Sequence, residues 1–159
     1  MPSQVGAGRN TGPCYIINIS MVYFIISGHR NITWEEFSRF YIPDILQAIA
    51  EDSSFVVGDC AGVDMLAQHF LKENGVTNVT VYHISSSPMF NSGFKTKGGF
   101  RSDVERDYTM TLESNEDILW IRPGWERSGT GNNLDRRVLQ KAGELSWENI
   151  NQVESNRFL

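Results

Sequence analysis

Residues 54–75 read SFVVGDCAGVDMLAQHFLKENG and hold one strand–turn–helix unit in sequence form. The β-branched and aromatic run Ser54–Val57 predicts a short buried strand. Gly58–Gly62 predicts a turn, and Val63–Asn74 carries apolar residues at helical spacing up to Gly75, a residue type that commonly ends helices. A buried strand that leads through a glycine-bearing turn into an amphipathic helix is the repeating unit of parallel α/β sheets.

The same unit recurs on both sides of this segment. Upstream, an apolar run ends at Ile26, and the T-x-x-E capping box at Thr33–Glu36 opens a helix that Pro43 must kink or split. Downstream, we expect a long loop over residues 85–99, strands at Val79–Ile84 and Asp117–Ile121, and helices at Arg101–Ser114 and Asn132–Lys141. This order predicts an α/β fold, a Rossmann-like three-layer sandwich with a mostly parallel, doubly wound sheet. Ligands of such sheets bind at the carboxyl ends of the strands.

The composition limits the function classes. The chain has 159 residues, of which 40% are apolar and 21% charged, and this fits one ordinary folded domain. Its 14 Lys and Arg residues against 19 Asp and Glu give a net charge of −5, so we do not expect a protein that grips DNA or RNA along the phosphates. A small anion in a local pocket is compatible with this charge, because backbone N–H groups bind phosphate without net charge.

Metal and membrane functions are also disfavoured. Cys14, Cys60 and three histidines lack the number and spacing of a disulfide framework or a metal site, so we expect no metal and no cofactor. The apolar run over residues 15–27 is too short to span a bilayer, and we expect a cytoplasmic protein. We interpret residues 1–20 as a flexible leader, residues 21–141 as the domain, and residues 142–159 as a C-terminal helix or arm.

The sharpest candidate for a ligand site is the SGTGN sequence at Ser128–Asn132, before the last expected helix. Small residues let the backbone approach a ligand closely, while free N–H groups and the helix dipole attract phosphate. Ser128 and Thr130 add hydroxyl groups. The alternative is an ordinary glycine-rich turn in which Asn132 is the N-cap.

The turn at Gly58–Asp64 is a second candidate, because it also follows a strand. Asp59 is placed to contact the hydroxyls of a ligand. Asp64 falls in the first turn of a helix, where a carboxylate either contacts a ligand or only stabilises the helix dipole.

Two further groups carry cationic side chains. After the first strand, Arg30 suits a phosphate and His29 suits base stacking or proton transfer, with a solvated loop as the alternative. On a later expected helix lie Arg101, Arg106 and Asp107, where the alternative is a solvated helix face.

These segments together resemble the SLOG superfamily, in its small bacterial and phage-type branch. The resemblance rests on Ser27–Arg30, Gly58–Asp64 with the following Leu66-Ala67, Arg106–Met110 and Ser128–Asn132, in this order, and covers about residues 22–141. SLOG proteins are Rossmann-like relatives of DNA-processing protein A and of the Lonely Guy phosphoribohydrolases. The resemblance implies a nucleotide or nucleotide-derived ligand and, for some members, hydrolysis of the N-glycosidic bond of nucleoside monophosphates.

Motif analysis and resemblance together define a candidate ligand site. Its residues are Gly28, His29, Arg30, Gly58, Asp59, Ala61, Gly62, Asp64, Arg106, Gly124, Ser128, Gly129, Thr130, Gly131 and Asn132. The sequence departs from the phosphoribohydrolase pattern at Asn133, where that branch carries Glu. A neutral amide replaces neither a general base nor a stabilising carboxylate, so the catalytic residue is unknown, with Glu126 and Asp59 as candidates.

We therefore expect the protein to bind a small phosphorylated, nucleotide-like ligand rather than a membrane or nucleic acid. The phosphate would lie on Ser128–Asn132 and Arg106, and the base and ribose between the Gly28 and Gly58 turns. The loop over residues 85–99 would cover them through Phe90 or Phe94.

Two other functions remain open. One is a nucleotide N-glycosidase, of phosphoribohydrolase or deoxyribosyltransferase type, that uses a relocated acidic residue. The other is a homo-oligomeric, non-catalytic interaction domain with Trp34, Trp125 and Trp147 at its contact surface.

Overall fold

A computed structural model describes residues 21–149 of the chain. The expected leader over residues 1–20 and the last ten residues of the expected C-terminal arm lie outside the described residues. No helix within residues 21–149 has the length and apolar character needed to cross a membrane.

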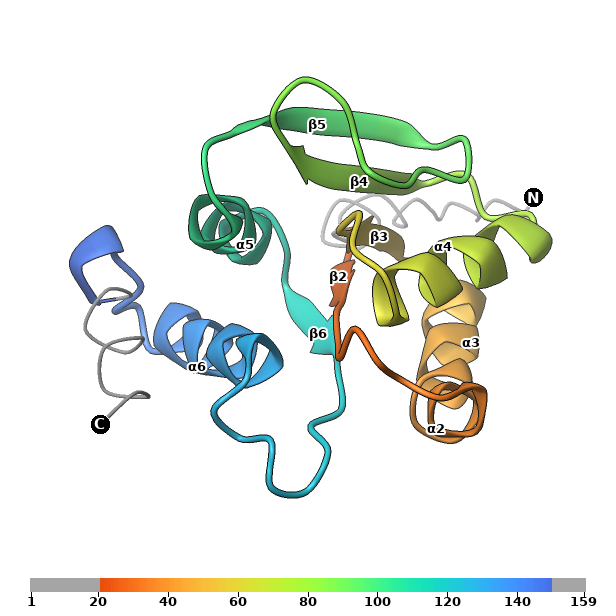
Figure 1. Ribbon diagram of the computed structural model, residues 1–159, viewed down its shortest axis with the longest axis horizontal. Coiled ribbons are helices and arrows are strands. Elements are labelled where there is room, and N and C mark those ends of the chain that lie inside the picture. The colour runs from red at the N-terminus through yellow and green to blue at the C-terminus, as the bar shows by residue number, and fades with distance from the viewer. Residues whose placement is uncertain (1–20, 150–159) are drawn as a thin grey trace, which may run out of the picture.

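Within the described residues, five strands form one parallel sheet, in the order β5-β4-β3-β2-β6 (Figure 1). They are β2 (Tyr23–Ile26), β3 (Ser54–Val57), β4 (Val79–Ile84), β5 (Lys95–Phe100) and β6 (Glu116–Ile118). The chain builds the sheet outward from β2 to β5 and then returns to place β6 on the other side of β2. The α/β fold class is confirmed. Strands are added on one side of β2 up to β5 and then on its other side at β6, so the position between β2 and β6 is the switch point at which such folds bind ligands.

Helices cover both faces of the sheet and complete three layers (Figure 1). One face carries α2 (Trp34–Phe40), α3 (Ile42–Ala50) and α4 (Val63–Glu73), and the other carries α5 (Asp103–Leu112) and α6 (Gly129–Lys141). The larger core cluster, with Phe37, Tyr41 and Phe55, lies under the first group. A smaller cluster around Met110 and Tyr82 lies under α5.

Several local sequence signals have the expected effect. Thr33 and Glu36 form the capping box that starts α2, and Pro43 stands at the start of α3, so the long predicted helix is split in two. Gly75 follows α4 with a φ of +71°, the left-handed conformation that favours glycine after a helix.

The expected loop over residues 85–99 was too long, because β5 forms within it. The KTKGGF sequence of this strand gives no apolar alternation, since β5 is an edge strand whose side chains are mostly exposed. Pairing with β4 places Gly98 against the ring of His83, where a Cβ atom would lie 2.0 Å from Cε1 of His83. Backbone hydrogen bonds to β4 and the close approach of Gly98 to His83 therefore hold β5 in the sheet, rather than the burial of apolar side chains.

Two boundaries near the C-terminus also differ from expectation. β6 is Glu116–Ile118 rather than Asp117–Ile121, and α6 begins at Gly129 rather than Asn132. The N-cap of α6 is Ser128, whose side chain accepts a hydrogen bond from the backbone N–H of Gly131, so the alternative assignment of Asn132 as N-cap was wrong.

The guanidinium of Arg137 attaches α6 to the rest of the molecule. Its Nε donates to Asp117 Oδ2 (3.0 Å), and its terminal nitrogens donate to Asp117 Oδ1 (3.2 Å), Ser114 O (3.0 Å) and Ser114 Oγ (2.7 Å). Both members of the ion pair are 6% exposed, and burial raises the pKa of Asp117 above its ordinary value. Removing the cation would therefore leave a buried, uncompensated carboxylate.

We expect Arg137→Met to lower the free energy of unfolding by about 3–5 kcal/mol at neutral pH, since it leaves the buried Asp117 carboxylate without its cationic partner. The loss should shrink as the solution becomes more acidic, because a lone Asp117 can then be buried in its protonated form. Lys141→Met is the matched control on the same helix. Lys141 pairs with Glu116 at the surface, with side chains 55% and 47% exposed, and such a pair contributes about 0–1 kcal/mol. Equal losses for the two variants in urea titrations would contradict the assignment.

Candidate functional site

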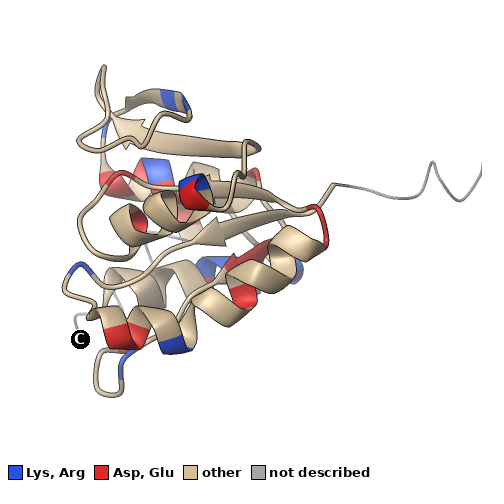
Figure 2. Cartoon of the chain, turned by 90° about the vertical axis from the view of Figure 1, so that its right-hand side faces the viewer, with Lys and Arg blue, Asp and Glu red and all other residues tan. Residues whose placement is uncertain are grey.

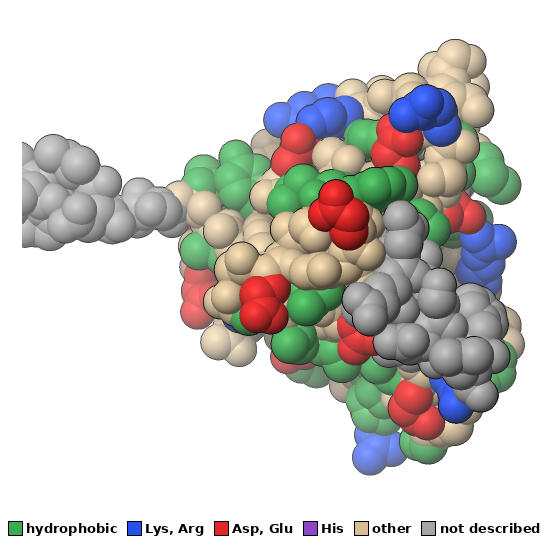
Figure 3. Space-filling view, turned by 90° about the vertical axis from the view of Figure 1, so that its left-hand side faces the viewer, with side chains coloured by type: hydrophobic (Ala, Val, Ile, Leu, Met, Phe, Trp, Pro, Cys, Tyr) green, Lys and Arg blue, Asp and Glu red, His purple; other side chains and the backbone are tan. Residues whose placement is uncertain are grey.

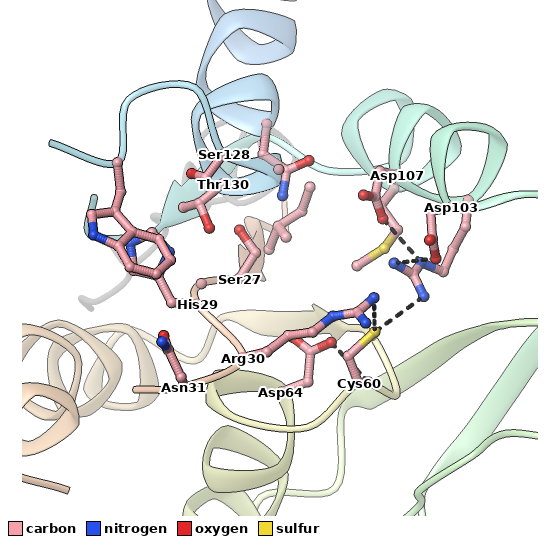
Figure 4. Close-up of a pocket in the computed structure, with 18 residues that line it drawn as sticks. Ser27, His29, Arg30, Asn31, Cys60, Asp64, Asp103, Asp107, Ser128 and Thr130 are labelled. Atoms are coloured by element: carbon pink, nitrogen blue, oxygen red, sulfur yellow. Dashed lines mark hydrogen bonds and ion pairs between the residues drawn. The ribbon is translucent and has the colours of Figure 1, made fainter. Parts of the chain in front are cut away.

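A cavity of about 480 Å³ opens at the carboxyl ends of β2 and β3. Its walls come from the turn after β2, the turn before α4, one face of α5 and the first turn of α6 (Figure 4). These are the segments that carry the sequence motifs. The cavity therefore lies where a parallel, doubly wound sheet places its ligands.

Nine of the fifteen predicted ligand-site residues line this cavity. They are Gly28, His29, Arg30, Gly58, Asp64, Arg106, Ser128, Gly129 and Thr130. The structure thus brings together three turns and one helix that are far apart in sequence.

The other six predicted residues do not line the cavity. Ala61 is exposed in its turn, and Gly131 and Asn132 lie within the start of α6, where they are not part of the lining. Gly62 has a φ of +82°, and a Cβ there would lie 2.4 Å from the carbonyl oxygen of His29, so this glycine packs two turns together. The remaining two, Asp59 and Gly124, belong to hydrogen-bond networks described below.

The predicted ligand site leaves out several lining residues, although Asp107 and the segment Arg106–Met110 were singled out in the sequence. Asp103, Asp107 and Met110 share one face of α5 with Arg106, and this helical spacing was a usable signal. Asn133 lies one turn after Gly129 in α6 and was noted only as a departure from a family pattern. Trp125 stands in an irregular connection, where no periodicity points to it.

The side chain of Ser27 is an unsatisfied polar group in the cavity. Ser27 is 8% exposed, and its Oγ has no hydrogen-bond partner among the described residues. A hydroxyl buried without a partner costs stability, so its presence is explained when a ligand supplies the missing hydrogen bond. Figure 4 shows this side chain in the part of the cavity near Ser128 and Thr130.

The first turn of α6 presents backbone donors to the same space. Ser128 N–H donates to Trp125 O (3.1 Å), and Gly131 N–H donates to Ser128 Oγ (3.3 Å). Gly129 and Thr130 stand between them, and their N–H groups precede the point at which helical acceptors become available. Both residues line the cavity, so the positive end of the helix dipole faces it.

Asn133 adds a side-chain donor one turn further along α6. Its Oδ1 accepts a hydrogen bond from Arg136 Nη1 (2.6 Å), and the residue is 8% exposed. With the oxygen engaged in this way, the amide nitrogen is the group of Asn133 that can donate to a ligand.

Arg106 is held by carboxylates rather than left for a ligand. Its guanidinium lies 3.2 Å from Asp59 Oδ1, 3.4 Å from Asp103 Oδ1 and 2.9 Å from Asp107 Oδ1. Burial lowers the pKa of Arg106, but Asp107 and its other neighbours outweigh burial and raise the pKa above its ordinary value. The expected role of Arg106 as a direct phosphate ligand therefore has no support in this geometry.

Asp64 is a strongly perturbed carboxyl in the cavity. Its Oδ2 accepts the backbone N–H of Cys60 (3.0 Å), and burial raises its pKa to about 7. A Cβ on Gly58 would lie 2.5 Å from Asp64 Oδ2, so the absence of a side chain at residue 58 makes room for this carboxyl. The sequence left two roles open for Asp64, contact with a ligand or stabilisation of the helix start. In the structure Asp64 lines the cavity and also holds the turn before α4 in place.

Cys60 lies between two guanidinium groups. Its Sγ is 3.6 Å from Arg30 Nη2 and 3.7 Å from Arg106 Nη1, while burial raises the pKa of the thiol above its ordinary value. Within residues 21–149 Arg30 has no ion pair with a carboxylate, and Figure 4 shows it reaching across the cavity. Arg30 rather than Arg106 is therefore the cationic side chain available to a ligand.

His29 connects the turn after β2 to the segment between β6 and α6. Its Nε2 accepts the backbone N–H of Arg122 (2.9 Å), which requires that this nitrogen carry no proton. The Arg122 guanidinium pairs with Glu36 (2.8 Å) and lies 4.8 Å from the centroid of the Trp125 ring. The Trp125 ring also contacts His29, with centroids 5.2 Å apart. These contacts fix the side of the cavity that Trp125 lines.

The two predicted catalytic carboxylates stand outside the cavity. Asp59 is 3% exposed, pairs with Arg106, and accepts the backbone N–H of Met89 (2.8 Å). Glu126 accepts the backbone N–H of Gly124 (2.9 Å). Neither lines the cavity, and the carboxyls that do are Asp64, Asp103 and Asp107.

The expected lid does not cover the cavity. Phe94 is 9% exposed and belongs to the main core, and Phe90 packs against His69, with centroids 5.1 Å apart. No residue between 85 and 99 lines the cavity. Hydrogen bonds from Met89 to Asp59 and from Ser92 to Gln68 hold this segment against the turn before α4 and against α4 itself.

Comparisons of the chain with protein-family models, with curated proteins and with solved structures find no match. The resemblance to the SLOG superfamily stays a hypothesis that rests on four short segments. Among residues 21–149, no group of three or more His, Cys, Asp or Glu side chains is placed to hold a metal ion.

The pKa of His29 should lie below its ordinary value of 6.5, first because of burial and then because of the Arg122 charge, which outweighs the opposing effect of Glu36. As the pH falls, His29 therefore binds a proton in the unfolded protein at a higher pH than in the folded protein. The free energy of unfolding falls as the pH drops below about 6.5, until folded His29 is also protonated. We expect His29→Gln to remove this part of the pH dependence, since its amide oxygen keeps the acceptor without titrating.

The pKa is measured by NMR of the imidazole, and the stability by urea titration at several pH values. His69→Gln, at an exposed position on α4, is the control with the same substitution. A His29 pKa at or above 6.5, or an unchanged slope in His29→Gln, would contradict the proposed protonation state.

Proposed function

We propose that the protein binds a small phosphorylated ligand of nucleotide type in the cavity at the carboxyl ends of β2 and β3. The observation that carries this proposal is the meeting of two groups that need a partner. Gly129 and Thr130, in the first turn of α6, line the same cavity as Ser27, whose buried hydroxyl has no partner among the described residues. A phosphate oxygen accepts hydrogen bonds from both kinds of donor.

Other donors surround the same space. Thr130 lines the cavity beside Ser128, Asn133 has its amide nitrogen left to donate, and Arg30 supplies a positive charge. The ring of Trp125 offers an apolar surface on which a base or another flat group can lie. The cavity volume of about 480 Å³ is within the range of small-molecule sites.

The charge distribution favours a small ligand over a polymer. The net charge is −5, and Figure 2 shows Lys and Arg interspersed with Asp and Glu rather than gathered in one stripe on the side in view. A nucleic-acid surface would need a continuous basic track to neutralise successive phosphates. A single pocket with neutral donors at a helix start does not.

Neither alternative function has a comparable observation in its favour. For an N-glycosidase, Glu126 and Asp59 are the acids that the sequence offered, and both are engaged outside the cavity. For an interaction domain, Trp34, Trp125 and Trp147 are exposed but do not form one surface. Trp34 belongs to α2 on one face of the sheet, whereas Trp147 contacts Tyr108 of α5 on the other.

The face of the molecule seen in Figure 3 supports the same conclusion. In the part of this face that grey atoms leave in view, its hydrophobic side chains are interrupted by acidic and basic ones. Exposed apolar residues that stand apart in this way are normal for a monomeric surface.

We expect Ser27→Ala to weaken the binding of adenosine 5′-monophosphate by about tenfold, since one hydrogen bond to a charged phosphate is lost. The free energy of unfolding without ligand should stay the same or rise, because the variant removes a buried hydroxyl that has no partner. Isothermal titration measures the first quantity and urea unfolding the second. Protection of Cys60 from alkylation, followed by peptide mass spectrometry, reports directly on occupancy of the cavity.

Ser92→Ala is the matched control. Ser92 Oγ is also buried without a partner, but Ser92 does not line the cavity, so its variant should leave binding unchanged. Absence of binding by folded protein at millimolar concentrations of nucleoside mono- and diphosphates would overturn the proposed function.

A further inference from the structure

One side of the cavity is acidic. The carboxyls of Asp64, Asp103 and Asp107 line it, and we call these three residues the acidic wall. In Figure 4, Asp103 and Asp107 lie on the opposite side of the view from His29, and Ser27, Ser128 and Thr130 lie nearer to His29. The cavity therefore joins a donor-rich region to an acceptor-rich region.

Arg106 holds two members of the acidic wall in place. It contacts Asp103 (3.4 Å) and Asp107 (2.9 Å) from within α5, and Asp59 (3.2 Å) fixes its other end from the turn after β3. The Arg106 side chain is 7% exposed, so most of its donor capacity is used inside the protein. Burial raises the pKa of Asp107 and raises that of Asp64 to about 7, so the negative charge of the wall grows as the pH rises toward 8.

A wall of this kind accepts hydrogen bonds and repels phosphate. Ionised carboxylates have acceptor oxygens only, and like charges at short range in a partly buried site are strongly unfavourable. A cationic ligand group is not required either, because Arg106 already stands between the carboxylates. Neutral donors that are attached close to a phosphate fit best, and the hydroxyls of a phosphorylated sugar are such donors.

We propose that the acidic wall binds the ring hydroxyls of a sugar whose phosphate lies at the first turn of α6, so that the site selects ribosyl phosphates over 2-deoxyribosyl phosphates. The inference rests on the proposed function, because the phosphate must be held at α6 for the sugar to reach the wall. Ser27 supports it independently of the acidic residues. This residue is more than nine-tenths buried, lines the same cavity, and has a hydroxyl without a partner that a ligand would satisfy.

The test compares three probes by isothermal titration: inorganic phosphate, ribose 5-phosphate and 2-deoxyribose 5-phosphate. The last two differ only in the hydroxyl at C2. We expect ribose 5-phosphate to bind about tenfold more tightly than its deoxy analogue, since a hydroxyl bound to a carboxylate is a charge-assisted hydrogen bond. Measurement at pH 8 keeps Asp64 mostly ionised, because its pKa is about 7.

Asp64→Asn and Asp103→Asn should each reduce this tenfold preference toward unity. The same variants should bind inorganic phosphate at least as tightly as the native protein, because they remove a negative charge from the cavity. A merely structural role of these residues would weaken all three probes together. Asp44→Asn is the matched control, because Asp44 is exposed in the first turn of α3, as Asp103 is in the first turn of α5.

The outcomes separate this inference from the proposed function. Equal affinity for the two sugar phosphates, or equal weakening of all three probes in both variants, overturns the sugar subsite and leaves phosphate binding in place. If none of the three probes and no nucleotide binds to the folded protein, the proposed function fails and the sugar subsite fails with it. A preference that only Asp64→Asn or Asp103→Asn abolishes, and not Asp44→Asn, supports the inference.

Discussion

The hydroxyl group of Tyr41 joins the ends of β2 and β6, the two neighbouring strands at which the strand order of the sheet reverses. It donates to the carbonyl oxygen of Ser27 (2.9 Å) and accepts the backbone N–H of Trp120 (3.0 Å), at the ends of β2 and β6. Tyr41 is fully buried, so water cannot replace either bond. A Cβ on Gly28 would lie 2.2 Å from this hydroxyl, and a glycine at residue 28 is therefore part of the same contact. The hydrogen bonds of Tyr41 to Ser27 and Trp120 thus position the turn with Ser27 and His29 and the chain that leads from Trp120 to Trp125.

Arginine side chains form ion pairs that connect separate segments of this acidic chain. Arg106, Arg122 and Arg137 each pair with carboxylates that lie far away in sequence, and each joins segments that the sheet alone does not connect. The guanidinium suits this role because its fork of donors bonds several oxygens at once. As a result the cavity obtains its donors mainly from neutral groups at the start of α6, and Arg30 is the cationic side chain that remains available there.

Periodicity and turn chemistry predicted most of the fold. Ser54–Val57, the capping box at Thr33 and the glycine after α4 each behave as local physics requires. The strand β5 could not be predicted, since its stability comes from backbone pairing with β4 and not from its own side chains. Local pattern carries little information about such an edge.

The candidate site was predictable in place but not in the roles of its residues. Strand-end turns brought Ser128, Gly58 and Arg30 to one cavity, as the parallel sheet requires. The pairing of Arg106 with Asp59, 47 residues away, depends on tertiary packing that no local rule reveals. The same is true of Ser27, whose missing hydrogen-bond partner is visible only when all neighbours are known.

The order of the strands also has a consequence for folding kinetics. β2, β3 and β4 each pair with the next strand along the chain, whereas β6 returns to β2 and joins residues 92 apart, as in the hydrogen bond from Tyr23 to the side chain of Asn115. Contacts that close long loops tend to form after local ones, because their entropic cost must be met first. We therefore expect β6 and α6 to dock last and to leave first. A molecule bound between β2 and α6 would then act mainly by slowing unfolding, and so would lengthen the lifetime of the native state more than it hastens its formation.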